Sequence, residues 1–173
     1  MNRYKFLSLF ILLLLNSIAG FSQYTISNIE CKYELKVSDS LIRSRDSTNG
    51  KDETVYYDDD AGIVFVITVK EGIFADNNAY INCTKEYLEK DLKEYQGDST
   101  LKLISCSKSP YYPDKTVVLH FESHIYPAGL NRCVIYFIHH RGKELQFSFI
   151  YDRANDKSSL AYINRIMQSL KLF

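Results

Sequence analysis

The sequence has no tryptophan, and its 173 residues include only three prolines and seven glycines. The scarcity of proline and glycine excludes collagen-like and low-complexity chains. The chain also has no net charge, because 21 Lys and Arg residues balance 21 Asp and Glu residues. Proteins that bind nucleic acid rely on a basic excess to neutralise phosphates, so we expect no nucleic-acid partner.

Sequence motifs for nucleophilic and redox catalysis are also missing. The chain has no Gly-x-Ser-x-Gly elbow and no Cys-x-x-Cys pair. The sequence therefore leans toward a non-enzymatic protein, although a catalytic pair that only the fold brings together stays open. Four cysteines are present, and in an exported protein they could form up to two disulfides in three alternative pairings or stay as buried thiols: Cys31, Cys83, Cys106 and Cys133.

The pattern of a signal peptide occupies residues 1–22. Arg3 and Lys5 supply a basic start, and residues 6–15 form an uncharged apolar run. Small residues just before Gln23 predict cleavage at that point. The apolar run is shorter than the roughly 20 residues that a bilayer span needs.

Residues 23–173 then form one domain by our prediction, without a further transmembrane segment. No cysteine lies next to the cleavage point, because the first is Cys31. A lipid anchor is therefore not expected, and we predict a periplasmic or extracellular location. The length suits a single hydrophobic core.

Hydrophobic periodicity predicts about six strands and two helices in this domain. Alternating or continuous apolar runs indicate strands at residues 24–37, 63–69, 101–107, 116–125, 132–140 and 144–151, and residues 54–57 form a short extended stretch. Apolar residues at helical spacing indicate amphipathic helices at residues 76–95 and 156–170. Short links join the last four strands, which predicts an antiparallel meander.

Two strand runs predict how the helices are arranged. Residues 63–69 and 133–138 are apolar without alternation, which is typical of strands that are buried on both faces. We therefore expect an α+β domain in which amphipathic helices pack on the faces of one antiparallel sheet of about six strands, as an α/β/α sandwich.

His120, Glu122 and His124 form the sharpest local pattern. Residues two apart on a strand point to the same face, so these three side chains would line one face together. Histidine and carboxylate ligands suit zinc and related ions. His139 or His140 on the next strand could complete a site, but adjacent residues face opposite ways and only one could join. The alternative is a solvated strip with ordinary hydrogen bonds, and we expect no other cofactor.

Two further groups of residues favour structural roles over chemistry. The acidic run at residues 58–60 lacks the spacing of a calcium-binding loop, which favours a solvated turn. Tyrosines at strand ends and turns either pack in and around the core or bind a peptide, a glycan or a partner protein: Tyr56, Tyr57, Tyr111, Tyr112 and Tyr126.

The order of predicted elements resembles that of the PsbP/Mog1-like domain over nearly all of residues 23–173. The most suggestive residues are Leu145-Gln146-Phe147-Ser148-Phe149 followed by Ile163, Ile166, Ser169 and Leu170. The resemblance implies an antiparallel sheet sandwiched between helices and a role in binding or assembly. Roles differ within such a family, so the resemblance assigns no functional residue.

Three hypotheses for function follow. The leading one is an exported, non-enzymatic binding or accessory protein of the cell envelope, whose partner is a protein or another envelope component. The second is a metal-binding protein or hydrolase that uses His120, Glu122 and His124. The third is an inhibitor or immunity protein that acts against a secreted toxin.

Overall fold

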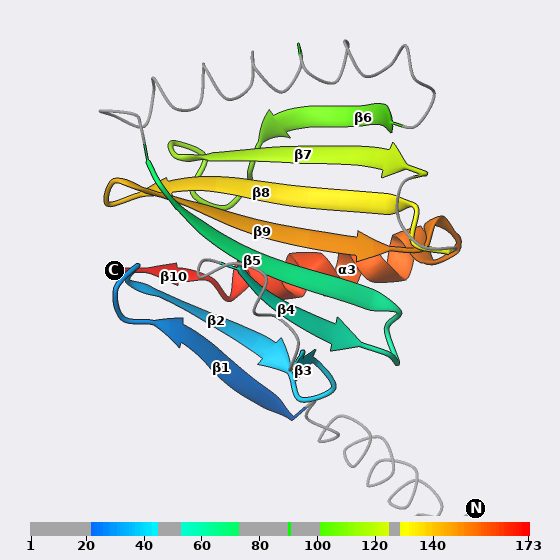
Figure 1. Cartoon of the computed structure of the whole chain (residues 1–173), viewed down its shortest axis with the longest axis horizontal. Helices are drawn as coiled ribbons and strands as arrows, with labels where there is room; N and C mark the ends of the chain where they lie inside the picture. The colour runs from blue at the N-terminus through cyan, green and yellow to red at the C-terminus, as the bar shows by residue number, and fades with distance from the viewer. Residues whose placement is uncertain (1–21, 45–52, 73–89, 91–100, 125–128) are drawn as a thin grey trace, which may run out of the picture.

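The computed structural model describes residues 22–44, 53–72, 90, 101–124 and 129–173, and Figure 1 shows their arrangement. These residues contain ten strands, the 3₁₀ helix η2 (Arg153–Asn155) and the α-helix α3 (Asp156–Gln168). Residues 1–21 of the predicted signal peptide lie outside the described residues, as does the predicted helix at residues 76–95 except for Lys90, which is helical.

The described strands form two antiparallel sheets. The larger sheet has seven strands, in the order β3 (Ile42–Arg43), β4 (Glu53–Asp58), β5 (Ile63–Glu71), β9 (Lys143–Tyr151), β8 (Arg132–His140), β7 (Thr116–Ser123) and β6 (Leu101–Lys108). The smaller sheet has the order β1 (Gln23–Asn28), β2 (Tyr33–Ser38) and β10 (Lys171–Leu172). Strands β6 to β9 are neighbours in chain order, which confirms the predicted meander.

The main core lies between one face of the larger sheet, helix α3 and the smaller sheet. Phe65 of β5 and Phe149 of β9 stack with ring centroids 4.4 Å apart. Tyr33 of β2 meets Phe147 edge-on at 5.5 Å, so the smaller sheet packs directly over the larger one. Helix α3 adds a buried apolar stripe that includes Ile163. The long aromatic side chains of β5 and β9 thus hold both covering elements in place.

A second buried cluster lies on the opposite face of the larger sheet. It consists of alternate residues of β7 and β8, which point the same way because the strands pair in register: Val117, Leu119, Phe121, Cys133 and Phe137. Burial on both faces of β8 agrees with the prediction from its continuous apolar run. The α+β class with mainly antiparallel strands is therefore confirmed.

The expected single sheet of about six strands is wrong, because residues 24–37 form two strands instead of one. A turn separates β1 from β2, in which the side-chain oxygen of Asn28 accepts a hydrogen bond of 2.8 Å from the backbone N–H of Cys31. Lys32 completes the turn with φ of 52°. Ile29 projects from this turn and is 81% exposed. An asparagine that bonds two or three residues ahead favours a turn, and the apolar alternation obscured it.

The stretch between residues 38 and 53, where the sequence predicts no strand, also contains regular structure. Ile42 and Arg43 form β3, which pairs with Tyr57 and Tyr56 at the edge of the larger sheet. Among the described residues, no helix has the length and hydrophobicity that a membrane span requires.

Candidate functional site

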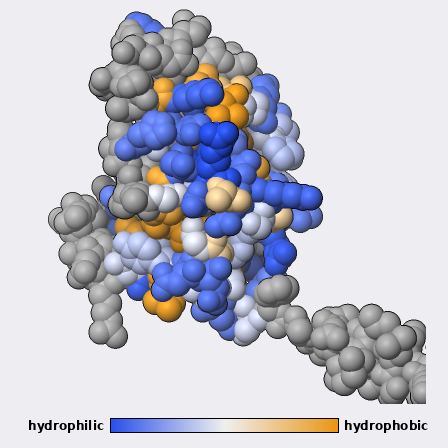
Figure 2. Space-filling model, turned by 90° about the vertical axis from the view of Figure 1, so that its right-hand side faces the viewer, coloured by the Kyte–Doolittle hydropathy of each residue, from blue (hydrophilic) through white to orange (hydrophobic). Residues whose placement is uncertain are grey.

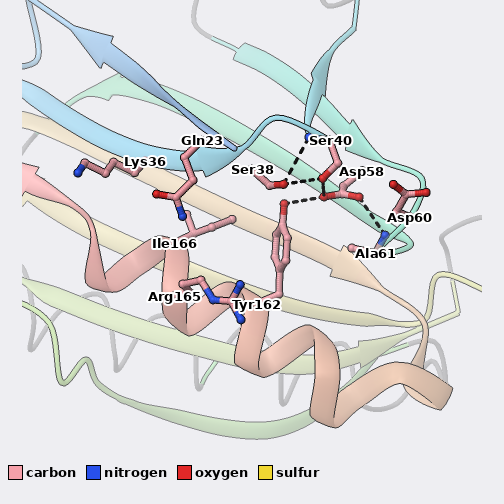
Figure 3. A pocket seen from close by; sticks show the side chains of 10 residues that line it. All are labelled: Gln23, Lys36, Ser38, Ser40, Asp58, Asp60, Ala61, Tyr162, Arg165 and Ile166. Atoms are coloured by element: carbon pink, nitrogen blue, oxygen red, sulfur yellow. Dashed lines mark hydrogen bonds between the residues drawn. The ribbon is translucent and has the colours of Figure 1, made fainter. Parts of the chain in front are cut away.

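Two adjoining pockets form a groove beside helix α3, which we call the α3 groove. The first has a volume of about 350 Å³, and Figure 3 shows the residues that line it: Gln23, Lys36, Ser38, Ser40, Asp58, Asp60, Ala61, Tyr162, Arg165 and Ile166. The second has a volume of about 430 Å³. The two pockets share Asp60, Ala61, Tyr162 and Arg165, so Tyr162 and Arg165 lie where they meet.

Three segments that are distant in sequence build the first pocket. Helix α3 supplies Tyr162, Arg165 and Ile166, which are three and four residues apart and therefore share one face of the helix. The turn between β4 and β5 supplies residues 58–61, and the β1–β2 hairpin with its following turn supplies the opposite side. Figure 3 shows Tyr162 pointing toward Ser38 and Asp58, and Ile166 lying next to Gln23.

Asp58 is the centre of the polar network beneath this pocket. Asp58 is only 2% exposed. One carboxylate oxygen accepts hydrogen bonds of 2.7 Å from the hydroxyls of Ser40 and Tyr162, and the other accepts one of 2.9 Å from the backbone N–H of Ala61. Burial alone would raise the pKa of Asp58, but these hydrogen bonds lower it below its usual value. The carboxylate is therefore held ionised and fixed in position.

Tyr162 links this network to the helix. Burial and the hydrogen bond to Asp58 raise the pKa of its phenol well above the usual value, so the hydroxyl stays protonated and donates. The network continues to Ser38, whose hydroxyl oxygen lies 2.7 Å from that of Ser40. Because Asp58 and Tyr162 bond to each other and to neighbouring protein groups, the network is suited to shaping a binding surface.

The rim of the groove carries charged side chains that are open to solvent. Lys36 and Arg165 contribute positive charge to the first pocket, and Asp60 lies at its junction with the second. Ala61, Ile166 and the ring of Tyr162 supply apolar surface between them. A groove of this composition can bind a ligand that combines an anionic group with an apolar or flat part.

The predicted metal ligands lie elsewhere, on and just after β7. Their strand face is not outward, since His120 and Glu122 point to the same side as the α3 core. Glu122 is 8% exposed and pairs with Arg132 and Arg153, each at 3.5 Å. His124 lies past the end of β7 and is exposed. Within the described ranges, no three ligand side chains are arranged to hold a metal ion.

His120 takes part in a short polar chain instead. Its Nε2 lies 3.3 Å from the hydroxyl of Tyr151, which donates to Asp156 at 2.9 Å. The Tyr151 hydroxyl uses its hydrogen to donate to Asp156, so it can only accept from His120. The hydrogen bond between His120 and Tyr151 therefore requires a hydrogen on Nε2 of His120. Of the two histidines at the end of β8, His140 approaches the backbone oxygen of Phe173 at 3.1 Å. The zinc hypothesis stays a prediction.

Most of the tyrosines singled out in the sequence have structural contacts. Tyr56 is buried and stacks on Phe65 with centroids 5.8 Å apart. The hydroxyl of Tyr112 donates to the backbone oxygen of Leu170 at 3.0 Å, which connects its turn to the link between α3 and β10. Tyr57 is 44% exposed, and Tyr126 lies outside the described residues.

Sequence reasoning missed the two residues at the centre of the site. Asp58 was assigned to a solvated turn, and it does stabilise that turn through Ala61, but it is buried. Tyr162 falls beside the predicted apolar stripe of its helix and bonds a residue 104 positions away. No local pattern identifies a contact over that separation, and only the turn sequence gave a partial signal.

The surface near the start of α3 and the ends of β4 and β9 is mainly polar. Figure 2 views the molecule from that side, and hydrophilic residues dominate the described part of this face, with hydrophobic residues in small separate groups. A ligand on this side would meet polar and charged groups first. The apolar contacts available to it are those inside the α3 groove.

Comparisons with known proteins identify the fold. The structure resembles the solution structure of cyanobacterial PsbP (CyanoP) from Synechocystis sp. PCC 6803, with a TM-score of 0.61, 10% sequence identity, and coverage of 90% of this chain and 95% of that chain. A crystal structure from Bacteroides thetaiotaomicron VPI-5482 gives a TM-score of 0.52 at 10% identity and covers 86% of this chain and 48% of that chain. The PsbP-like fold predicted from the order of elements is thus confirmed.

Comparison of the sequence itself finds less. No protein-family model matches the chain. No curated protein matches it either. At 10% identity the structural likeness establishes the fold alone, so function has to be argued from the residues of the site.

Proposed function

We propose that this chain is an exported, non-enzymatic binding or accessory protein of the cell envelope, and that the α3 groove is its binding site. The observation that carries the proposal is the groove itself, because it is built by three separate segments over a rigid buried network. A fully bonded Asp58 and a phenol that stays protonated serve to position groups. Neither is poised to exchange a proton near neutral pH, which favours binding over acid–base catalysis.

The charges of the groove indicate the kind of partner. Lys36 and Arg165 lie on the same pocket, and both residues are exposed. A planar guanidinium and an ammonium together suit a carboxylate or phosphate group. The partner is therefore a protein segment or envelope component that presents an anionic group beside an apolar part.

The proposal includes a second helix on the other face of the larger sheet. The cluster around Leu119 and Phe121 is buried, and the sequence pattern of residues 76–95 predicts an amphipathic helix with an apolar stripe suited to cover it. Replacing Leu88 or Leu92 with Asp would place a charge against that cluster. We expect a loss of several kcal/mol in unfolding free energy, on the scale of a buried unpaired charge, about 3 kcal/mol or more.

A charge-reversal pair tests the binding site. The groove variant carries Lys36→Glu and Arg165→Glu, and the matched control carries Lys102→Glu and Lys108→Glu at two exposed residues of β6. Both change the net charge by the same amount, and circular dichroism with thermal melting verifies that both fold. Each protein is immobilised and exposed to envelope extracts, and bound components are quantified by mass spectrometry.

The proposal predicts a stoichiometric component that wild type and the β6 control retain equally and that the groove variant loses. Equal retention by all three proteins would show that the partner binds elsewhere. If wild type retains no component at all, the proposal as a whole is contradicted.

A further inference from the structure

Gln23 is the residue at which the predicted amino terminus of the exported chain meets the α3 groove. The signal-peptide pattern predicts cleavage directly before it, which would leave it as the first residue with a free α-amino group. The structure also begins β1 at Gln23 and places its side chain on the first pocket of the α3 groove. An amino-terminal glutamine can react with itself, because its amine and its side-chain amide can close a five-membered ring.

We propose that Gln23 is a modification site, where the exported chain forms an amino-terminal pyroglutamyl residue. The α-nitrogen attacks the side-chain carbonyl carbon Cδ, a new N–Cδ bond forms, and the Cδ–Nε2 bond breaks. A proton from the α-nitrogen leaves with Nε2 as ammonia. The step needs no oxidant or second reactant. It rests on the export and cleavage included in the proposed function.

The strand register leaves the backbone nitrogen of Gln23 available for this reaction. The N–H of Asp39 donates to the oxygen of Ser22 at 3.1 Å, which makes residues 22 and 39 a hydrogen-bonded pair. Such pairs alternate along antiparallel strands, so Gln23 and its partner Ser38 form a non-hydrogen-bonded pair. The nitrogen of Gln23 therefore points away from β2, and ring closure breaks none of the β1–β2 hydrogen bonds.

The position of β1 keeps this nitrogen accessible. Among the described strands, β1 is the outermost member of the smaller sheet, with β2 as its neighbour. Gln23 itself is exposed, and Figure 3 shows its carboxamide beside Ile166 at the rim of the pocket. Neither reacting group is enclosed, so the side chain can rotate back toward its own amine.

The charges around the pocket favour the cyclised product. Lys36 and Arg165 already line the same pocket, and cleavage would add a third positive group, the α-ammonium of Gln23. The lactam nitrogen is neutral, so ring closure removes that like charge. The amino terminus that borders the groove is then an uncharged ring, and Lys36 and Arg165 remain as the cations of the first pocket.

Mass spectrometry of the exported protein tests this inference. The full chain is expressed in cells that export it, recovered from outside the cytoplasm and labelled with an amine-reactive reagent while folded. It is then digested and sequenced by tandem mass spectrometry. We expect an amino-terminal peptide that begins at residue 23, weighs one ammonia less than the unmodified peptide and carries no label on its first residue.

Two controls separate this result from artefacts of handling. Peptides that contain the internal residues Gln146 and Gln168 should show no loss of ammonia. The variant Gln23→Ala should yield a labelled amino terminus at residue 23, because alanine has no amide to attack.

Each other outcome overturns the inference in a recognisable way. A labelled, unmodified glutamine at residue 23 in aged protein contradicts cyclisation and leaves export intact. A chain that starts at any other residue contradicts the cleavage position and with it the inference. Recovery only inside the cell, with residues 1–22 retained, contradicts export and therefore the proposed function too.

Discussion

The two carboxylates that are buried among the described residues differ in how they are held. Asp58 lies 2% exposed and accepts three hydrogen bonds of 2.7 to 2.9 Å from uncharged donors. Glu122 lies 8% exposed and meets two arginines at 3.5 Å, one of which has a side chain that is 63% exposed. The first arrangement fixes one geometry by short directional bonds. The second depends on longer ion pairs that water can partly replace.

This difference shows why the strip with the clearest sequence pattern is not the site with the more rigid polar network. The pattern of the His120–Glu122 strip consists of histidine and glutamate at every second position of one strand. Its side chains are each occupied by a separate partner, Tyr151 for His120 and two arginines for Glu122. Asp58 and Tyr162 form no pattern in the sequence, yet they join two distant segments at the wall of a groove.

Replacing each carboxylate with its isosteric amide should give the largest difference in stability between the two sites. In Asp58→Asn, the amide NH₂ must face at least one of the three donors, so we expect the free energy of unfolding to fall by about 3 kcal/mol. In Glu122→Gln, the amide oxygen can still accept from an arginine and the exposed Arg153 can be hydrated, so we expect a loss of about 1 kcal/mol.

Urea denaturation of both variants beside wild type measures this difference. Asp59→Asn serves as the control for the turn, because Asp59 is exposed and should change stability little. An equal loss for the two amide variants would contradict the distinction between the two sites.

Removing a single hydroxyl should have a smaller effect. Tyr162→Phe keeps the ring and deletes the 2.7 Å bond to Asp58, so we expect a loss of about 1.5 kcal/mol, as for a hydrogen bond to a charged group. Tyr57→Phe at the exposed edge of the sheet is the matched control and should lose less than about 0.5 kcal/mol. Thermal and urea unfolding of the pair should give the same order, and a silent Tyr162→Phe would show that the network does not stabilise the groove.

The pH dependence of stability should reflect the buried position of His120. Burial and the nearby Arg132 lower the pKa of His120 below its usual value, while Asp156 opposes them. The unfolded chain therefore binds a proton at higher pH than the folded chain does. The stabilisation is complete above the ordinary histidine pKa of about 6.5 and is lost as pH falls from there through the folded pKa.

Urea denaturation at pH 7.5 and pH 5.5 measures this slope. We expect wild type to lose more stability between these pH values than His120→Gln does. Burial also lowers the pKa of His140, so part of the slope should remain in His120→Gln. Identical slopes for wild type and His120→Gln would contradict the buried position of His120.

The smallest expected effect is that of zinc. Because Glu122 and His120 already have protein partners and His124 lies beyond the strand, calorimetry of the purified protein with zinc should show no stoichiometric binding. Binding of one equivalent that His120→Gln abolishes would restore the metal-binding hypothesis. Binding that this variant leaves unchanged would indicate a different metal site.

The sequence predicted the elements far better than the site. Alternation predicted β7 and β9, and a continuous apolar run predicted β8, because burial of one or both faces of a strand determines which of its adjacent residues are apolar. The turn at Asn28 was missed since apolar residues continue the alternation across it. The Asp58–Tyr162 contact spans 104 positions, and no periodicity encodes a pairing of that kind.

The central claim is that the α3 groove, and not the histidine strip, meets the partner. A photo-reactive amino acid placed at Ala161, an exposed residue of the groove, can be compared with one placed at the exposed His124. Both proteins are expressed in cells that export them and are irradiated before lysis. The account predicts a discrete crosslinked adduct from position 161 and none from position 124, and an adduct from position 124 alone would contradict it.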